Sequence, residues 1–134
     1  MFKKLLTLFL VSLTVLNLCG CVLIMAGLAN TAKARQVVDL SYVNALDIVK
    51  EAVKVEGIEF KKAVIRGNIA EVKGKYTDGK DVRIYVSKTG NNQSYISVRV
   101  GTSAAGRKDA QHILDTIVQL AKKQAQMEKA LSSK

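Results

Sequence analysis

The segments DVRIYVS (residues 81–87) and SYISVRV (residues 94–100) decide the fold of this chain. Both alternate apolar and polar side chains with a period of two, which predicts strands that have one buried and one exposed face. The inward set is Val82, Ile84, Val86, Ile96, Val98 and Val100. A turn over residues 89–92, TGNN, separates the two segments, so we predict that they pair as an antiparallel hairpin.

Two further strands are predicted before this hairpin. Residues 58–65 begin with apolar–polar alternation, and residues 69–76 follow after a glycine-containing turn. An Asp-Gly pair within residues 77–80 is a strong hairpin signal and leads into the next strand. Ile69 and Val72 have opposite parity, so a bulge or a change of register is compatible with the strand over residues 69–76.

Two amphipathic helices complete the set of elements. The first has its apolar stripe at helical spacing, on Tyr42, Leu46, Val49 and Val53. Ser41 is its predicted N-cap and Gly57 the glycine that ends it. The second begins near residue 107 and carries Ala110, Ile113, Leu114, Ile117, Leu120 and Ala121 on one face. Its pattern continues to Leu131, but the chain beyond Lys122 is polar and we expect it to fray.

The order of elements predicts the fold class. A short strand over residues 35–40 precedes the first helix, so the order is strand, helix, four strands, helix. An antiparallel sheet with one apolar face and two amphipathic helices predicts a two-layer α+β sandwich. A sheet curved around a long C-terminal helix is one form of this architecture, and it often leaves a small apolar cavity between helix and sheet.

The N-terminus has the three parts of a secretory signal sequence. Two lysines are followed by mostly apolar residues 5–18, and a small residue then precedes a cysteine. The run LCGC (residues 18–21) resembles the lipobox of bacterial lipoproteins, which is Leu, a variable residue, a small residue and Cys. The match falls on Cys21, because Cys19 follows a bulky leucine. The resemblance implies that Cys21 is diacylated, that the chain is cut before it, and that the new N-terminus is acylated.

This segment sets the predicted organisation of the chain. We predict a signal peptide over residues 1–20, a lipidated tether over residues 21–34 and a single domain over residues 35–134. A plain transmembrane helix is the alternative, because residues 5–32 carry no charge and are long enough to span a bilayer of roughly 30 Å. A disulfide between the two cysteines is a second alternative, but cleavage before Cys21 would remove its partner.

The predicted localisation is the bacterial cell envelope. The residue after the lipobox cysteine is Val22 rather than the aspartate that signals inner-membrane retention in enteric-type sorting, which favours the outer membrane. The chain would then be held by its lipid anchor and face the periplasm or the cell surface. No cysteine would remain for disulfide or thiol chemistry in the mature chain.

The charge balance is strongly basic. The chain has 21 Lys and Arg against 11 Asp and Glu, and loss of Lys3 and Lys4 with the signal peptide leaves 19 against 11, a net charge of +8. Such an excess favours anionic surroundings. Behind an export signal these would be phospholipid head groups, lipopolysaccharide phosphates or acidic glycans rather than nucleic acid. The alternative is that scattered lysines only keep the protein soluble.

Three short motifs carry a resemblance to a known family. They are ISVRVGT (residues 96–102), ILDTI (residues 113–117) and AVKVEGI (residues 52–58). Together they resemble a family of small proteobacterial lipoproteins known as a domain of unknown function, over most of residues 35–122. The resemblance implies a fold related to helix-grip or TATA-binding-protein-like domains, a place among envelope lipoproteins of which some are virulence-associated, and no established catalytic residues. Many members have Gly-Asp after the Val-Gly-Thr run, an acid that the loop over residues 103–107 lacks.

Two candidate sites follow from the predicted sheet. Arg83, Tyr85, Tyr95 and Arg99 should share the face away from the helices, where arginine and tyrosine suit a binding surface for an anionic envelope component or a protein partner. The alternative is an ordinary solvated sheet face stabilised by cross-strand pairs. A rival function is a periplasmic carrier of a small apolar ligand or lipid, in a cavity lined by Val98, Ile113 and Ile117.

The sequence offers no catalytic constellation. His112 is the single histidine, and a metal site would need more His or Cys ligands than the chain has. Ser103, His112 and Asp115 form only a nominal triad, because the serine lies on no strand-to-helix elbow. We therefore predict a non-enzymatic envelope lipoprotein, without metal or cofactor, that binds a protein or envelope component.

Overall fold

The computed structural model describes residues 3–4 and 33–134. Residues 33–134 form one compact unit. Its elements in chain order are β1 (Lys33–Val38), α2 (Tyr42–Val55), β2 (Glu59–Arg66), β3 (Ile69–Lys75), β4 (Asp81–Gly90), β5 (Gln93–Val100) and α3 (Gly106–Ser132). Cys21, and the predicted signal peptide apart from Lys3 and Lys4, lie outside the described residues.

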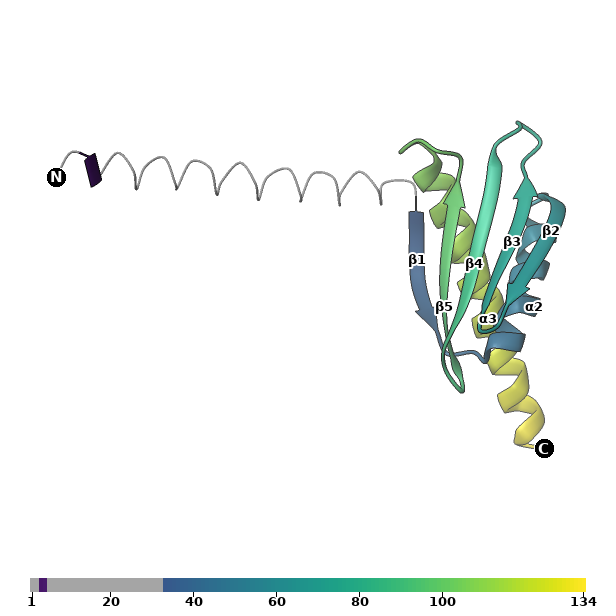
Figure 1. Cartoon of the computed structure of the whole chain (residues 1–134). Helices are drawn as coiled ribbons and strands as arrows, with labels where there is room; N and C mark the ends of the chain where they lie inside the picture. The colour runs from purple at the N-terminus through teal and green to yellow at the C-terminus, as the bar shows by residue number, and fades with distance from the viewer. Residues whose placement is uncertain (1–2, 5–32) are drawn as a thin grey trace. The chain divides into compact units, whose positions relative to one another are not determined.

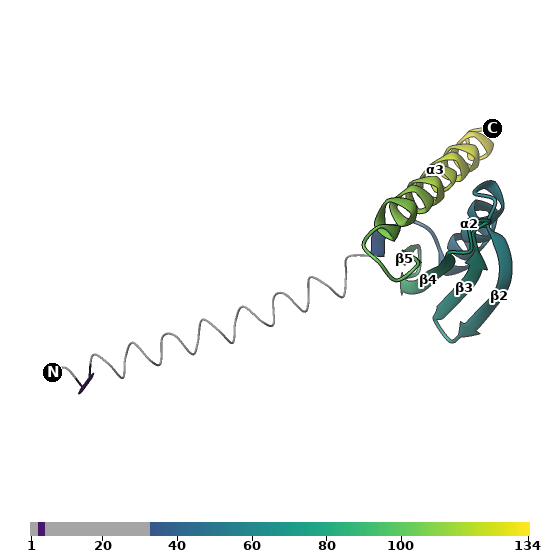
Figure 2. The same cartoon turned by 90° about the horizontal axis from the view of Figure 1, so that it is seen from above.

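The strands form one antiparallel sheet in the order β1-β5-β4-β3-β2. The first strand therefore returns to pair with the last, while the three hairpins β2–β3, β3–β4 and β4–β5 join sequence neighbours. Figure 1 shows the sheet in front of both helices, and Figure 2 shows the same two helices on one side of it. The predicted two-layer α+β sandwich is confirmed.

The core lies between this sheet and the helices. In the central strands the six residues predicted to point inward are all 0 or 1 % exposed. The register pairs Val82 with Val100, Ile84 with Val98 and Val86 with Ile96. The helices close the core with Ala45, Val49, Ala52, Ile113 and Ile117, each 0 % exposed. Full burial of a Val or Ile side chain contributes about 1.5–3 kcal/mol to folding, so this layer fixes which sheet face the helices cover.

The ends of α2 are set by the predicted residues. The Ser41 hydroxyl accepts a hydrogen bond from the backbone N–H of Asn44 at 3.4 Å. At the other end Gly57 has φ +66°, and its N–H donates to the carbonyl of Lys54 at 3.1 Å. The N–H of Ile58 reaches back to Val53 at 3.0 Å, which completes a Schellman motif. Glycine adopts this conformation without steric cost, and the chain turns directly into β2.

The sheet changes register at two places, one in β2 and one between Lys88 and Gly90 of β4, and neither lies in the strand considered from the sequence. β3 pairs without interruption along its length, whereas β2 changes register between Phe60 and Lys62. Ile69 is instead 52 % exposed, because it directly follows the β2–β3 turn and points away from the helices. β2 is an edge strand, so an unpaired residue disturbs hydrogen bonds with only one neighbour, and bulges are frequent at such edges.

Two boundaries also differ from the sequence prediction. β1 begins at Lys33 and ends at Val38, two residues before the predicted range at each end. Beyond it the carbonyl of Leu40 accepts a hydrogen bond from the buried Ser94 hydroxyl at 2.9 Å, which ties this connection to β5.

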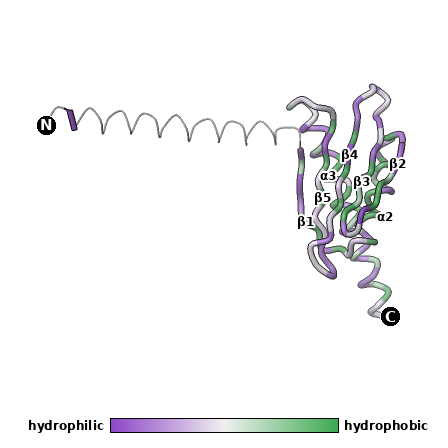
Figure 3. Tube along the Cα trace, in the orientation of Figure 1, coloured by the Kyte–Doolittle hydropathy of each residue, from purple (hydrophilic) through white to green (hydrophobic). Residues whose placement is uncertain are grey.

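The C-terminal helix extends beyond the part that packs on the sheet. α3 continues past Lys122 to Ser132, although no residue beyond Ala121 is buried. Figure 3 shows hydrophilic and hydrophobic residues mixed along this exposed part. The segment is rich in Ala, Gln, Lys and Glu, which have high helix propensity, so local preference sustains the helix without packing.

Candidate binding surface on the open sheet face

The side of the sheet away from the helices, here called the open face, carries all four residues predicted as a binding surface. Arg83 lies directly opposite Arg99 in the β4–β5 ladder. Tyr85 pairs with Ser97 and Tyr95 pairs with Ser87, which makes the two tyrosines diagonal neighbours. Diagonal pairs lie about 7–8 Å apart, within reach of aromatic side chains. The structure therefore brings the predicted set together.

The arginine pair has an unusual electrostatic setting. Like charges directly opposite each other in adjacent strands destabilise a sheet. The Arg99 Nε donates to the carbonyl of Gly101 at 3.3 Å, but in the described part of the chain neither arginine has a carboxylate within ion-pair distance. A hollow of about 130 Å³ adjoins the pair, lined by Asp81, Arg83, Arg99, Gly101 and Thr102. These guanidinium groups remain available to an external anion.

Tyr85 is held in place by a carboxylate on β3. Its hydroxyl donates to Glu71 Oε1 at 2.9 Å, and Lys73 Nζ lies 3.4 Å from Glu71 Oε2. Burial alone would raise the pKa of Glu71, but the hydrogen bonds from Tyr85 and Lys73 and the charges of Lys73 and Arg83 outweigh it and lower that pKa. Glu71 is therefore ionised near neutral pH and fixes the tyrosine ring on the open face.

A second hollow of about 380 Å³ lies over β2, β3 and β4. Its lining combines basic, apolar and aromatic side chains: Lys62, Val64, Arg66, Ile69, Glu71, Lys73 and Tyr85. Together, this hollow and the one beside the arginine pair give the open face depressions large enough to receive a small charged group.

The register extends the arginine pair into a line of five basic residues, here called the cation row. Lys33 pairs with Arg99, Arg99 with Arg83, Arg83 with Lys73, and Lys73 with Lys62. Every strand thus contributes one cation to a single row across the sheet. Sequence reasoning missed the three lysines, because alternation predicts the face on which a residue lies but not its partner on the next strand.

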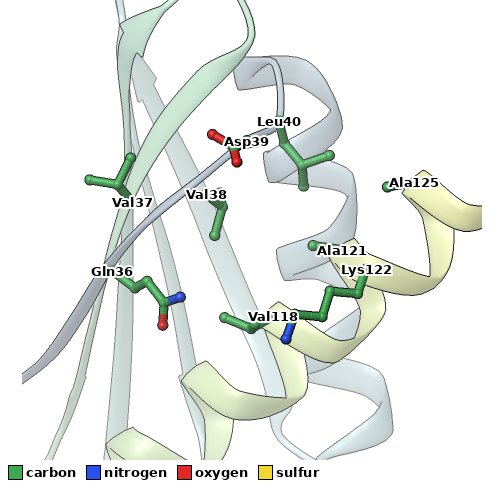
Figure 4. A pocket seen from close by; sticks show the side chains of 9 residues that line it. All are labelled: Gln36, Val37, Val38, Asp39, Leu40, Val118, Ala121, Lys122 and Ala125. Atoms are coloured by element: carbon green, nitrogen blue, oxygen red, sulfur yellow. The ribbon is translucent and has the colours of Figure 1, made fainter.

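The residues predicted to line a ligand cavity lie in the packed core. Val98, Ile113 and Ile117 are each 0 % exposed and belong to the cluster that joins the sheet to α3. An apolar groove of about 230 Å³ lies elsewhere, between the end of β1 and α3. Figure 4 shows Val38 and Leu40 on the side of α3, while Val37 points away from it. The complete lining is Gln36, Val37, Val38, Asp39, Leu40, Val118, Ala121, Lys122 and Ala125.

The nominal triad is not assembled. His112 is 72 % exposed, and its Nε2 lies 3.3 Å from Glu56 Oε2 rather than near Asp115. Asp115 accepts a hydrogen bond from the Gln111 side chain at 2.9 Å. Glu56 also accepts a hydrogen bond from the Thr116 hydroxyl, so it joins α2 to α3 as a structural link.

The described residues contain neither a candidate metal site nor a candidate membrane-spanning helix. Within residues 3–4 and 33–134, no group of three or more His, Cys, Asp or Glu side chains could hold a metal ion. Neither helix of the compact unit is long and apolar enough to cross a membrane.

The fold and the open face define a class: a small α+β domain with helices on one side of its sheet and a cationic surface on the other. The chain belongs to the family described as Protein of unknown function (DUF3568), whose model matches residues 4–119. No curated protein matches it. The resemblance found in the sequence is thus confirmed to the level of a family of unknown function, and the matched range includes both the N-terminal apolar segment and the open face.

Proposed function

We propose that this protein is a lipid-anchored envelope lipoprotein of the small proteobacterial type, without enzymatic activity, that binds an envelope component through its open face. Its destination is the outer membrane. One observation carries the proposal: the helices bury one face of the sheet, and the other face presents the arginines and tyrosines at positions free to meet a partner. Arg and Tyr are enriched at binding surfaces, because each combines a broad contact area with hydrogen-bonding groups.

The lipid anchor rests on the lipobox and is tested by mass. Protein extracted from membranes is expected to begin at Cys21 and to carry the added mass of acyl chains. The Cys21→Ser variant should lack both the cleavage and the added mass. An uncut, unacylated wild-type chain would contradict the anchor and favour a membrane-spanning segment.

The binding surface is tested by charge reversal. Cross-linking in intact cells should yield a defined set of envelope adducts with the wild-type chain, and their amount should fall by about tenfold or more for Arg83→Glu/Arg99→Glu, because reversed charge repels an anionic partner. The matched control is Lys50→Glu/Lys54→Glu, which changes the net charge equally on exposed positions of α2. Equal losses in both variants would assign the effect to net charge and reject the open face.

A further inference from the structure

We propose that the open face lies flat on an anionic phospholipid bilayer, with the cation row over the lipid phosphates. The inference rests on the proposed function, because it deepens the identity of the envelope component that this face meets. It is carried by the register of the sheet, by the charges that the described residues leave uncompensated, and by the point at which the domain joins its N-terminal segment.

The cation row has the geometry of a surface contact. Adjacent strands lie about 4.8 Å apart, so five strands spread the row over about 19 Å. In the described part of the chain, Lys73 alone among the five has a carboxylate within ion-pair distance, Glu71 at 3.4 Å. Two of the like-charge pairs, Lys33–Arg99 and Arg99–Arg83, contain no cation with such a carboxylate, and they destabilise the sheet unless an anion lies over them. A bilayer presents phosphates in a plane, which matches an extended row better than a single small anion does.

The opposite end of the open face carries exposed apolar and aromatic side chains, with Arg66 beside Ile69 on the edge strand. Val37 pairs with Tyr95, and Ser87 pairs with both Tyr95 and Ile69, which places these residues in one row. Val37 is 47 % and Ile69 52 % exposed. Tyrosine and exposed aliphatic side chains suit the boundary between head groups and acyl chains. A soluble polyanion would satisfy the cation row but leave this second row in water, so the combination favours a membrane.

The connection to the N-terminal segment also favours a membrane as the partner of the open face. Lys33 is both a member of the cation row and the first residue of β1, twelve positions after Cys21. Twelve residues extend at most about 40 Å, so an acylated Cys21 keeps the open face within reach of its own bilayer. Anchoring at such short range raises the effective concentration of lipid phosphates around the face and lets individually weak contacts persist.

The native lysines allow a direct test on the full chain. The protein is purified in neutral detergent and reconstituted into vesicles of phosphatidylcholine alone or of phosphatidylcholine with phosphatidylglycerol. A membrane-impermeant amine-acylating reagent is applied, and labelling at each lysine is followed by mass spectrometry. In the anionic vesicles, Lys33, Lys62 and Lys73 should label about fivefold more slowly than in neutral vesicles, while Lys50 and Lys54 on α2 keep their rates. Protection should disappear in about 1 M salt, where the Debye length falls to about 3 Å.

A double variant tests the row as a unit. Arg83→Gln/Arg99→Gln should remove most of the protection at the three lysines, whereas Lys50→Gln/Lys54→Gln, with the same loss of charge, should leave it intact. Equal labelling in both kinds of vesicle, or slowing at all lysines alike, would overturn the inference. Protection by soluble polyphosphate as strong as that by anionic vesicles would also overturn it. The mass of the purified protein shows separately whether the chain begins at an acylated Cys21. Failure of the cation row to bind lipid and failure of the proposed lipoprotein identity are therefore distinguishable.

Discussion

The Gly106→Ala variant is expected to lose at least about 3 kcal/mol of unfolding free energy, at the upper end of what overpacked sites cost. Gly106 is the first residue of α3, and a Cβ built on it would lie 1.8 Å from the backbone oxygen of Val100. No side chain can rotate to relieve this contact, because the obstacle is the main chain at the end of β5. Either α3 or β5 must shift, and both contribute fully buried residues to the core.

Chemical denaturation of the full chain in mild detergent, followed by far-ultraviolet circular dichroism, measures this loss. Gly90→Ala is the matched control, because its added Cβ would meet only the Cβ of Gln93, at an ordinary 3.5 Å. We expect the control to change stability by less than about 1 kcal/mol. Since small domains are stable by only about 5–15 kcal/mol, the Gly106 variant would lose a large share of its margin. Equal midpoints for the two variants would show that α3 does not start against β5.

The Ile113→Ala variant is expected to lose about 4 kcal/mol, within the range for large-to-small changes in a packed core. Ile113 is 0 % exposed and lies among the buried residues that hold α3 on the sheet. Truncation removes buried methyl and methylene groups and leaves a cavity that the surrounding strands cannot fully close. The same denaturation measurement applies.

Leu131→Ala is the control for this change, because Leu131 lies on the same helix but is 75 % exposed. Its effect should stay within about 0.5 kcal/mol. The comparison also tests the predicted carrier function, in which Ile113 lines a ligand cavity. A residue beside an existing cavity loses few contacts on truncation, so a cost for Ile113→Ala close to that of the control would favour the carrier and contradict a packed interior.

Much of the fold could be predicted because its signals are local. Ser41 and Gly57 act on groups within a few residues of themselves, so the ends of α2 followed directly from the sequence. Period-two alternation likewise identified the inward residues of β4 and β5. The positions of the register changes in β2 and β4 could not be predicted, because they depend on how neighbouring strands pair. That is a property of the whole sheet order rather than of the segment over residues 69–76.

The residues of the candidate site could likewise be predicted only where the signal is local. The sequence identified Arg83, Tyr85, Tyr95 and Arg99, because consecutive strands joined by a short turn place alternate residues on one face. Lys33 escaped notice because β1 pairs with β5 across the 54 residues of chain that separate Val38 from Gln93. Lys62 was missed because of the bulge beside it. Alternation from Phe60 predicts that Lys62 points to the buried face, and the register change places it on the open face instead.

By itself the sequence determined the α+β class, the two helices and the face of each central strand, since each is written in residue type and spacing over short distances. The tertiary structure alone decided that β1 completes the sheet beside β5, that the interior around Ile113 is closed, and that five cations align in one row. The physical reason is that register and sheet order arise from contacts between distant segments, and a one-residue slip in any strand would have moved its cation to the buried face.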